Sequence, residues 1–232
     1  FPQGAELLAR PDGAVLSGAN LAALQGPDGR WEVLQFAGAE LVAPGKYRLS
    51  RFLRAQGGTE DAMANPVPAG ARFVLLDGAL RQVPLSLDQR GLPITWRYGP
   101  SGRAPDHSFY REEARAFDAL GLRPLSPVHL RASRDPATGD IALGWIRRTR
   151  LGGDSWEGEV PLAEEREAYR LDILSGGIPV RTVETVSPAW TYPAAAQTAD
   201  FGAPVGGALT VRVAQLSVLF GPGLARTATL YL

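Results

Sequence analysis

Short apolar runs separated by glycine and proline recur along the chain and predict an all-β protein. Residues 31–36 alternate between the two sides of an extended chain, and residues 46–49 do the same. Between them, Pro44-Gly45 suits a type II turn, because glycine accepts the positive φ of the third turn position. The 27 glycines and 19 prolines fall between such runs, which is typical of many strands joined by turns.

The middle of the chain continues this pattern. Residues 73–76 and 79–83 flank Asp77-Gly78, and we expect a hairpin there, because both central positions of such a turn need positive φ. Residues 94–98 are a further candidate strand. Residues 109–120 contain good helix formers but also alternate, and we expect a strand.

Strand alternation is clearest after residue 127. Ile141, Leu143 and Trp145 point to one side, and this places Trp145 in a core. The same alternation starts again at Tyr169 and at Leu209, and residues 227–232 form a last strand. Regular short strands over about 100 residues, with a Trp of the buried type, indicate an immunoglobulin-like sandwich.

A proline-rich segment at residues 121–127 divides the chain. Pro124 and Pro127 hold it extended and predict a linker. We therefore expect two domains, a β-rich domain at residues 1–124 that belongs to a larger polypeptide and a β-sandwich at residues 125–232.

Composition narrows the class of function. The chain has 24 Lys and Arg residues against 24 Asp and Glu, and this zero net charge argues against nucleic-acid binding. Hydrophobic residues make up 45%, enough to bury a core. There is no cysteine, so disulfides and Cys-ligated metals are excluded within this chain.

No motif indicates catalysis. The two histidines, His107 and His129, have no partner at metal-ligand spacing, and neither a nucleophile elbow nor a phosphate-binding loop is present. Glu157 and Glu159 would share a face of a strand, as paired glycosidase carboxylates do, but any solvated strand offers such a pair. We expect no enzyme activity, no cofactor and no metal.

A few residues are candidates for binding. Arg147 and Arg148 form a basic cluster that suits an anion or a polysaccharide, although a solvent-facing strand end is the more common explanation. Trp156, Trp190 and Tyr192 fall in expected loops or strand ends. Such aromatics either stack on sugars and anchor partners, or close the ends of a sandwich core.

Three runs resemble a known family. KYRLSRFLRAQGGTE at residues 46–60 is similar to the L-x-R-L-L-R-G-x-x-G-T-E signature of phage tail-tip hub proteins. ARFVLLDG at residues 71–78 and GLRPLSPVHL at residues 121–130 follow in the same order. Together they resemble the C-terminal part of the large tail protein of gene transfer agents and related siphophages. Ala55 departs from the signature, which has glycine at this position.

The second half resembles a fibronectin type III domain in that context. Trp145 matches its buried strand-B Trp and Tyr169 its strand-C Tyr, while Leu209 stands on strand F where a Tyr is usual, which puts the corner hydrogen bond in doubt. The resemblance implies a homotrimeric structural protein of the particle's tail tip. Its partners would be other tail, distal-tail or fibre proteins and host cell-surface polysaccharide, with roles in host attachment and DNA delivery.

Another class of function fits the second half. Fibronectin-type domains also serve as carbohydrate-binding accessory modules of secreted polysaccharide-acting enzymes. The three runs before residue 131 favour the tail-tip hypothesis over this one.

Overall fold

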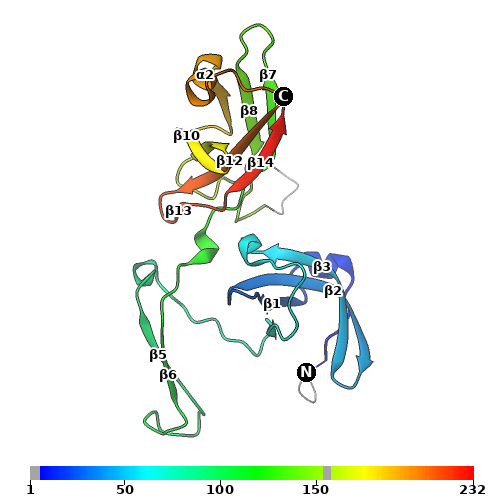
Figure 1. Cartoon of the computed structure of the whole chain (residues 1–232). Coiled ribbons are helices and arrows are strands. Elements are labelled where there is room, and N and C mark those ends of the chain that lie inside the picture. The colour runs from blue at the N-terminus through cyan, green and yellow to red at the C-terminus, as the bar shows by residue number, and fades with distance from the viewer. Residues whose placement is uncertain (1–5, 154–157) are drawn as a thin grey trace. The chain divides into compact units, whose positions relative to one another are not determined.

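The computed structural model describes residues 6–153 and 158–232 and is almost entirely β (Figure 1). The chain divides into two compact units. One contains residues Phe1–Asp77 and Leu122–Leu232, and the other contains Gly78–Gly121. The all-β prediction is therefore confirmed.

The first part of the larger unit is an antiparallel sheet with the order β3-β2-β1-β4. Its strands are β1 (Leu21–Gln25), β2 (Trp31–Ala43), β3 (Lys46–Gln56) and β4 (Phe73–Leu75). Helix α1 (Asp12–Leu16) precedes β1, and the 3-10 turn η1 (Glu60–Ala62) follows β3. A small core forms from four buried side chains, namely Leu7, Ala22, Leu34 and Phe36.

The two turn predictions in this region have opposite outcomes. Pro44-Gly45 joins β2 to β3, with Ala43 opposite Lys46 and Gly45 at φ 68°. The hairpin expected around Asp77-Gly78 is wrong, because β4 pairs with β1 and residues 79–83 form no strand. All five side chains of residues 79–83 are exposed, so this run has no buried face to hold it against β4.

Strand β3 contains an irregularity at Ala55. The pairing of β2 with β3 shifts register between Val33 and Gln35, opposite the segment that contains Ala55. Ala55 has φ 56°, a left-handed conformation that favours glycine. The residue that departs from the hub signature is therefore one whose backbone suits the glycine of that signature.

The smaller unit is built around one hairpin. It contains the 3-10 turn η2 (Leu87–Gln89) and strands β5 (Ile94–Tyr98) and β6 (Arg111–Arg115), which pair with each other. The strand expected within residues 109–120 is thus present as β6. The 3-10 turn η3 (Leu120–Leu122) leads back into the larger unit.

Residues 128–232 fold as an immunoglobulin-like sandwich. One sheet has the order β11-β8-β7, from β7 (Val128–Arg134), β8 (Ile141–Ile146) and β11 (Ala189–Tyr192). The other contains β10 (Ile178–Thr185), β9 (Tyr169–Ser175), β12 (Ala208–Ser217), the short β13 (Gly221–Pro222) and β14 (Arg226–Tyr231), and β12 lies between β9 and β14. In chain order this matches strands A, B and E facing strands C′, C, F and G of a fibronectin type III-like domain.

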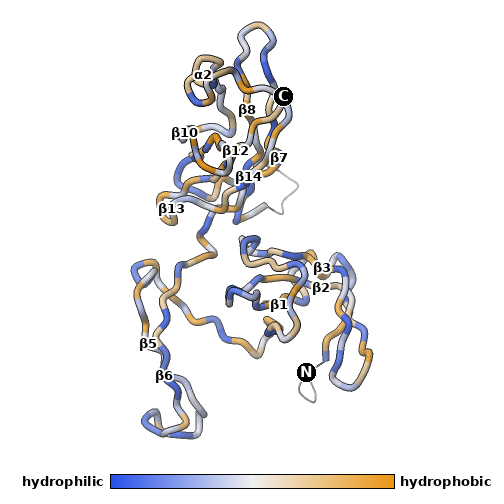
Figure 2. The backbone as a smooth tube through the Cα atoms, viewed as in Figure 1, coloured by the Kyte–Doolittle hydropathy of each residue, from blue (hydrophilic) through white to orange (hydrophobic). Residues whose placement is uncertain are grey.

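The core of the sandwich comes from the alternating residues of four strands. Figure 2 shows hydrophobic and hydrophilic stretches interspersed along the chain of the sandwich. Trp145 is 3% exposed and packs edge-on against Tyr169, with ring centroids 5.3 Å apart. The remaining buried members are Ile141, Leu143, Leu171, Ile173, Tyr192, Leu209, Val211 and Val213.

The connection between β11 and β12 is held by side-chain hydrogen bonds, although Leu209 has no hydroxyl for the corner hydrogen bond of a Tyr. Helix α2 (Ala194–Phe201) connects β11 to β12, and its Gln197 is fully buried. The Gln197 amide donates to the carbonyls of Gly139 and Tyr192, at 3.0 and 2.9 Å, and accepts from the Val205 N–H. Tyr192 donates its hydroxyl hydrogen to Asp200 of the same helix. The β11–β12 connection is therefore fixed by side chains of α2.

The segment expected to be a linker packs against the sandwich. Pro124 and Pro127 are both buried, and the Leu224 N–H donates to the Pro124 carbonyl at 3.0 Å. A Cβ on Gly223 would lie 2.6 Å from Pro124, so glycine is needed for this close approach. The prolines thus anchor the entering chain to the sandwich, and a domain boundary near residue 124 stays a prediction.

We predict that Trp145→Ala lowers the free energy of unfolding by about 3–5 kcal/mol, because it empties a large volume in the core. Urea unfolding of the purified chain measures this change. Ile146→Ala is the matched control, since the neighbouring Ile146 side chain is 49% exposed and should matter much less. An equal decrease in the free energy of unfolding in both variants would contradict the observed orientation of this strand.

We also predict that Ala55→Gly stabilises the chain by about 0.5–1 kcal/mol. Relief of a left-handed conformation, about 1–2 kcal/mol, outweighs the entropic cost of glycine, about 0.5–1 kcal/mol. Thermal or urea unfolding measures the effect. Ala39→Gly in β2 should have the opposite sign, because Ala39 has no positive φ, and a destabilising Ala55→Gly would argue against the bulge.

Candidate functional site

Residues of the run that resembles the hub signature form a polar junction with other segments, around the turn that follows β3. The junction begins with Glu32 on β2, whose side chain is 1% exposed. Arg54 donates to both Glu32 carboxylate oxygens at 2.6 Å, and the Ala55 N–H donates to one of them at 2.9 Å. The hydrogen bonds with Glu32 raise the pKa of Arg54 above its ordinary value. The buried carboxylate therefore fixes the bulge in β3.

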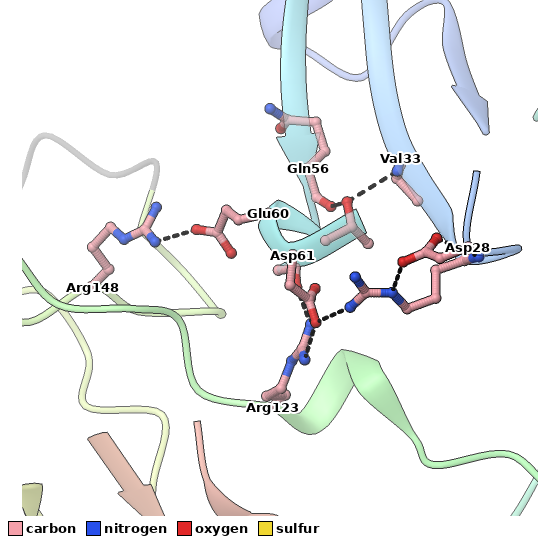
Figure 3. Close-up of polar contacts among 10 residues, drawn as sticks. Asp28, Val33, Gln56, Glu60, Asp61, Arg123 and Arg148 are labelled. Atoms are coloured by element: carbon pink, nitrogen blue, oxygen red, sulfur yellow. Dashed lines mark hydrogen bonds and ion pairs between the residues drawn. The ribbon is translucent and has the colours of Figure 1, made fainter. Parts of the chain in front are cut away.

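The turn itself depends on two glycines and a threonine. Gly57 and Gly58 have φ values of 61° and 76°, which other residues rarely adopt. Thr59 donates its hydroxyl hydrogen to the Gln56 carbonyl at 2.7 Å and accepts from the Val33 N–H at 3.0 Å (Figure 3). The hydroxyl thus ties the turn back to β2.

Asp61 in η1 is held between two arginines. Arg123 reaches both of its carboxylate oxygens, at 2.7 and 2.9 Å, and also donates to the Gly58 carbonyl at 2.7 Å. Arg30 approaches the same carboxylate at 2.8 Å and also binds Asp28 (Figure 3). The hydrogen bonds from Arg123 are the main cause that lowers the pKa of Asp61 below its ordinary 3.8.

Glu60 makes a second link to the chain that enters the sandwich. It forms an ion pair with Arg148, which also donates to the carbonyl and the hydroxyl of Ser126 at 2.8 and 2.9 Å. A Cβ on Gly58 would lie 3.1 Å from the Leu125 side chain. Glycine at 58 therefore satisfies both a left-handed backbone and a tight contact.

The junction joins two of the three runs that carry the family resemblance. Gly58 and Glu60 come from residues 46–60, which Asp61 directly follows, and Arg123, Leu125 and Ser126 come from residues 121–130. The contacts are hydrogen bonds, most of them charge-assisted, and one close packing contact, which suits a role in holding the chain together. Among residues 6–153 and 158–232, no group of three or more acidic or histidine side chains could hold a metal ion.

The basic candidates are occupied by contacts within the chain. Arg147 donates to the carbonyls of Val160 and Pro161. Arg148 belongs to the junction, and its side chain is 35% exposed. An open cluster of arginines for an anion or a polysaccharide is therefore not what the structure presents.

The aromatic candidates are divided between the core and the undescribed segment. Tyr192 is fully buried, and Trp190 stacks on it with ring centroids 5.3 Å apart and packs against the core. Both close the sandwich rather than offer a surface for sugars. Trp156 and Glu157 lie outside the described residues, and Glu159 is exposed on a segment that is not a strand.

Several residues of the junction were not singled out from the sequence, among them Arg123, Asp61 and Glu32. Arg123 lies inside a quoted run, where its charge next to Pro124 was a usable signal. Asp61 directly follows the signature. Glu32 gave no signal, because an acidic residue in an alternating strand is normally placed on the solvent side.

Comparison with known proteins adds one family. Residues 2–74 match the family model described as "Rcc01698-like, C-terminal", a family associated with gene transfer agents by its name. The match contains the first of the three runs and part of the second. No curated protein matches the chain in sequence.

Among solved structures, the chain is similar to the "rat CD45 extracellular region, domains d3-d4". The sequence identity is 10% and the TM-score 0.34, with 84% of this chain and 94% of that chain covered.

We predict that Arg123→Met lowers the free energy of unfolding by about 1–3 kcal/mol at neutral pH, because Asp61 and the Gly58 carbonyl lose a partly buried donor. Asp61 has a lowered pKa when folded, so this stabilisation is present well above pH 3.8 and is lost as the pH falls through the folded-state pKa. Urea unfolding at neutral pH and at about pH 3 should therefore show the difference between variant and parent shrinking in acid.

Arg30→Met is the matched control for this experiment. It removes the other arginine on Asp61, but the Arg30 side chain is 53% exposed while that of Arg123 is 12% exposed. A smaller loss is expected from Arg30→Met. An Arg123→Met effect that is the same at both pH values would show that the ion pair with Asp61 contributes nothing.

Proposed function

We propose that this chain is a non-enzymatic structural part of the tail tip of a gene transfer agent or a related phage-like particle. The observation that carries the proposal is the family match over residues 2–74, a region whose signature residues build the junction. The residues of this signature pack and form ion pairs, as expected for a structural component. An all-β fold ending in an immunoglobulin-like sandwich agrees with this role.

The proposed role is assembly. The resemblance to tail-hub proteins implies a homotrimer in the full-length protein, in contact with other tail, distal-tail or fibre proteins. With 24 positive and 24 negative side chains, the chain has no net charge to oppose packing against copies of itself. In this role the protein contributes to host attachment and DNA delivery, and host cell-surface polysaccharide is a further partner.

Imaging of particles tests this proposal. An epitope inserted at Gly176-Gly177, between β9 and β10, lies on an exposed turn of the sandwich. Antibody labelling of particles that carry the full-length tagged protein should place the epitope at the tail tip, in three copies. Untagged particles give the background. A tagged protein that remains soluble and is absent from purified particles would exclude the proposal.

A further inference from the structure

The smaller unit carries many apolar side chains but no core. Every residue of Gly78–Gly121 is described, and none of them is buried. Nine large apolar side chains in this unit are exposed, namely Leu80, Val83, Leu85, Leu87, Leu92, Tyr98, Phe109, Phe117 and Leu120. A two-stranded hairpin is at best marginally stable in water, and contiguous apolar surface marks sites of interaction.

One face of the hairpin has the composition of an interface. Ile94, Trp96 and Tyr98 of β5 lie on the same side, because side chains alternate along a strand. The Phe117 ring meets the Trp96 ring edge-on, with centroids 5.8 Å apart. Opposite them on β6 are Arg115, Glu113 and Arg111. Aromatic residues and arginine are the types enriched where proteins associate.

Both strands of the hairpin also have a free edge. Within the described residues, β5 pairs only with β6 and β6 only with β5. Unpaired strand edges are templates for another strand, and natural proteins normally cover them. This unit lacks the cover that a third strand would give.

We infer that Gly78–Gly121 is an assembly arm, and that its occupant is the same arm of a neighbouring copy of this chain. The inference rests on the self-association in the proposed function and names the surface that would carry it. The β5 edge of one copy would take the β6 edge of the next, which is a head-to-tail contact. Contacts of this kind close into a ring when the rotation from one copy to the next closes, and a closed ring leaves no edge exposed.

Charge complementarity supports a second copy as the occupant. The hairpin itself shows that β5 and β6 are compatible antiparallel partners, with Arg97 opposite Glu112 and Ile94 opposite Arg115. Repeating this register between copies again places Arg97 next to an acid and brings no like charges opposite each other. The arm also carries six arginines and five acidic residues, so two arms do not repel strongly.

The first test is the oligomeric state of the purified 232-residue chain, measured by analytical ultracentrifugation over a range of concentrations. The chain should associate reversibly. Tyr98→Arg should weaken association at least about tenfold, because it places a second positive charge opposite Arg111 of the next copy. Val186→Arg is the control, since Val186 is a 76% exposed apolar residue outside the arm, and it should leave association unchanged.

The second test examines the register between the β5 and β6 strands of neighbouring copies. The chain has no cysteine, so each introduced cysteine is the only thiol of its chain. Thr95 and Ala114 are opposite each other in the β5–β6 pair. A mixture of Thr95→Cys chains and Ala114→Cys chains should form a cross-linked dimer with a short bismaleimide, while each variant alone should not. Circular dichroism and urea unfolding of all variants check that they fold like the parent.

Two results would overturn the inference. One is a parent chain that stays monomeric at every concentration. The other is association that Tyr98→Arg does not weaken and that yields no cross-linked dimer in the mixture of Thr95→Cys and Ala114→Cys chains. Both results concern the purified chain, so the inference about the arm can fail while imaging still places the protein at the tail tip. Conversely, arm-dependent association of a protein that is absent from particles would reject the proposed function alone.

Discussion

A carboxylate that is removed from water needs charged or hydrogen-bonding partners, and Glu32 places that requirement at the centre of the first sheet. Arg54 binds both of its oxygens, and the Ala55 N–H binds one of them. Because Glu32 accepts a hydrogen bond from the backbone of Ala55, it also fixes the point at which β3 leaves regular register. The Gly57-Gly58 turn starts from there, so the position of η1 and its two carboxylates depends on this buried charge.

The turn transmits this constraint to the rest of the larger unit. Glu60 and Asp61 are consecutive in the chain and form ion pairs with different arginines, Arg148 and Arg123 respectively. Two separate ion pairs restrict rotation about either one, and the Leu125 contact at Gly58 restricts it further. The signature that resembles tail-hub proteins is thus accounted for by backbone conformation and ion pairing, without assigning it any chemistry.

Local signals were reliable where the strands beside them had a face to bury. Pro44-Gly45 and Asp77-Gly78 are both strong turn signals, but only the first joins two paired strands. The second failed because β4 was already paired with β1, a strand about 50 residues earlier, and the run after the turn had no buried side chains. The prolines at 124 and 127 were likewise recognised as rigid, but their burial depends on contacts from Gly223 and Leu224.

The sequence by itself determined β8, β9, β12 and β14 of the sandwich and the side of each that faces the core, but it did not indicate β10, β11 or α2. Alternation is a local property of an extended chain, so Trp145 and Tyr169 could be oriented without knowing their neighbours. Only the tertiary structure decided the junction. Arg123 meets Asp61 across 62 residues and Arg148 meets Glu60 across 88. With 24 charges of each sign, sequence alone offers far too many pairings, and the path of the chain selects among them.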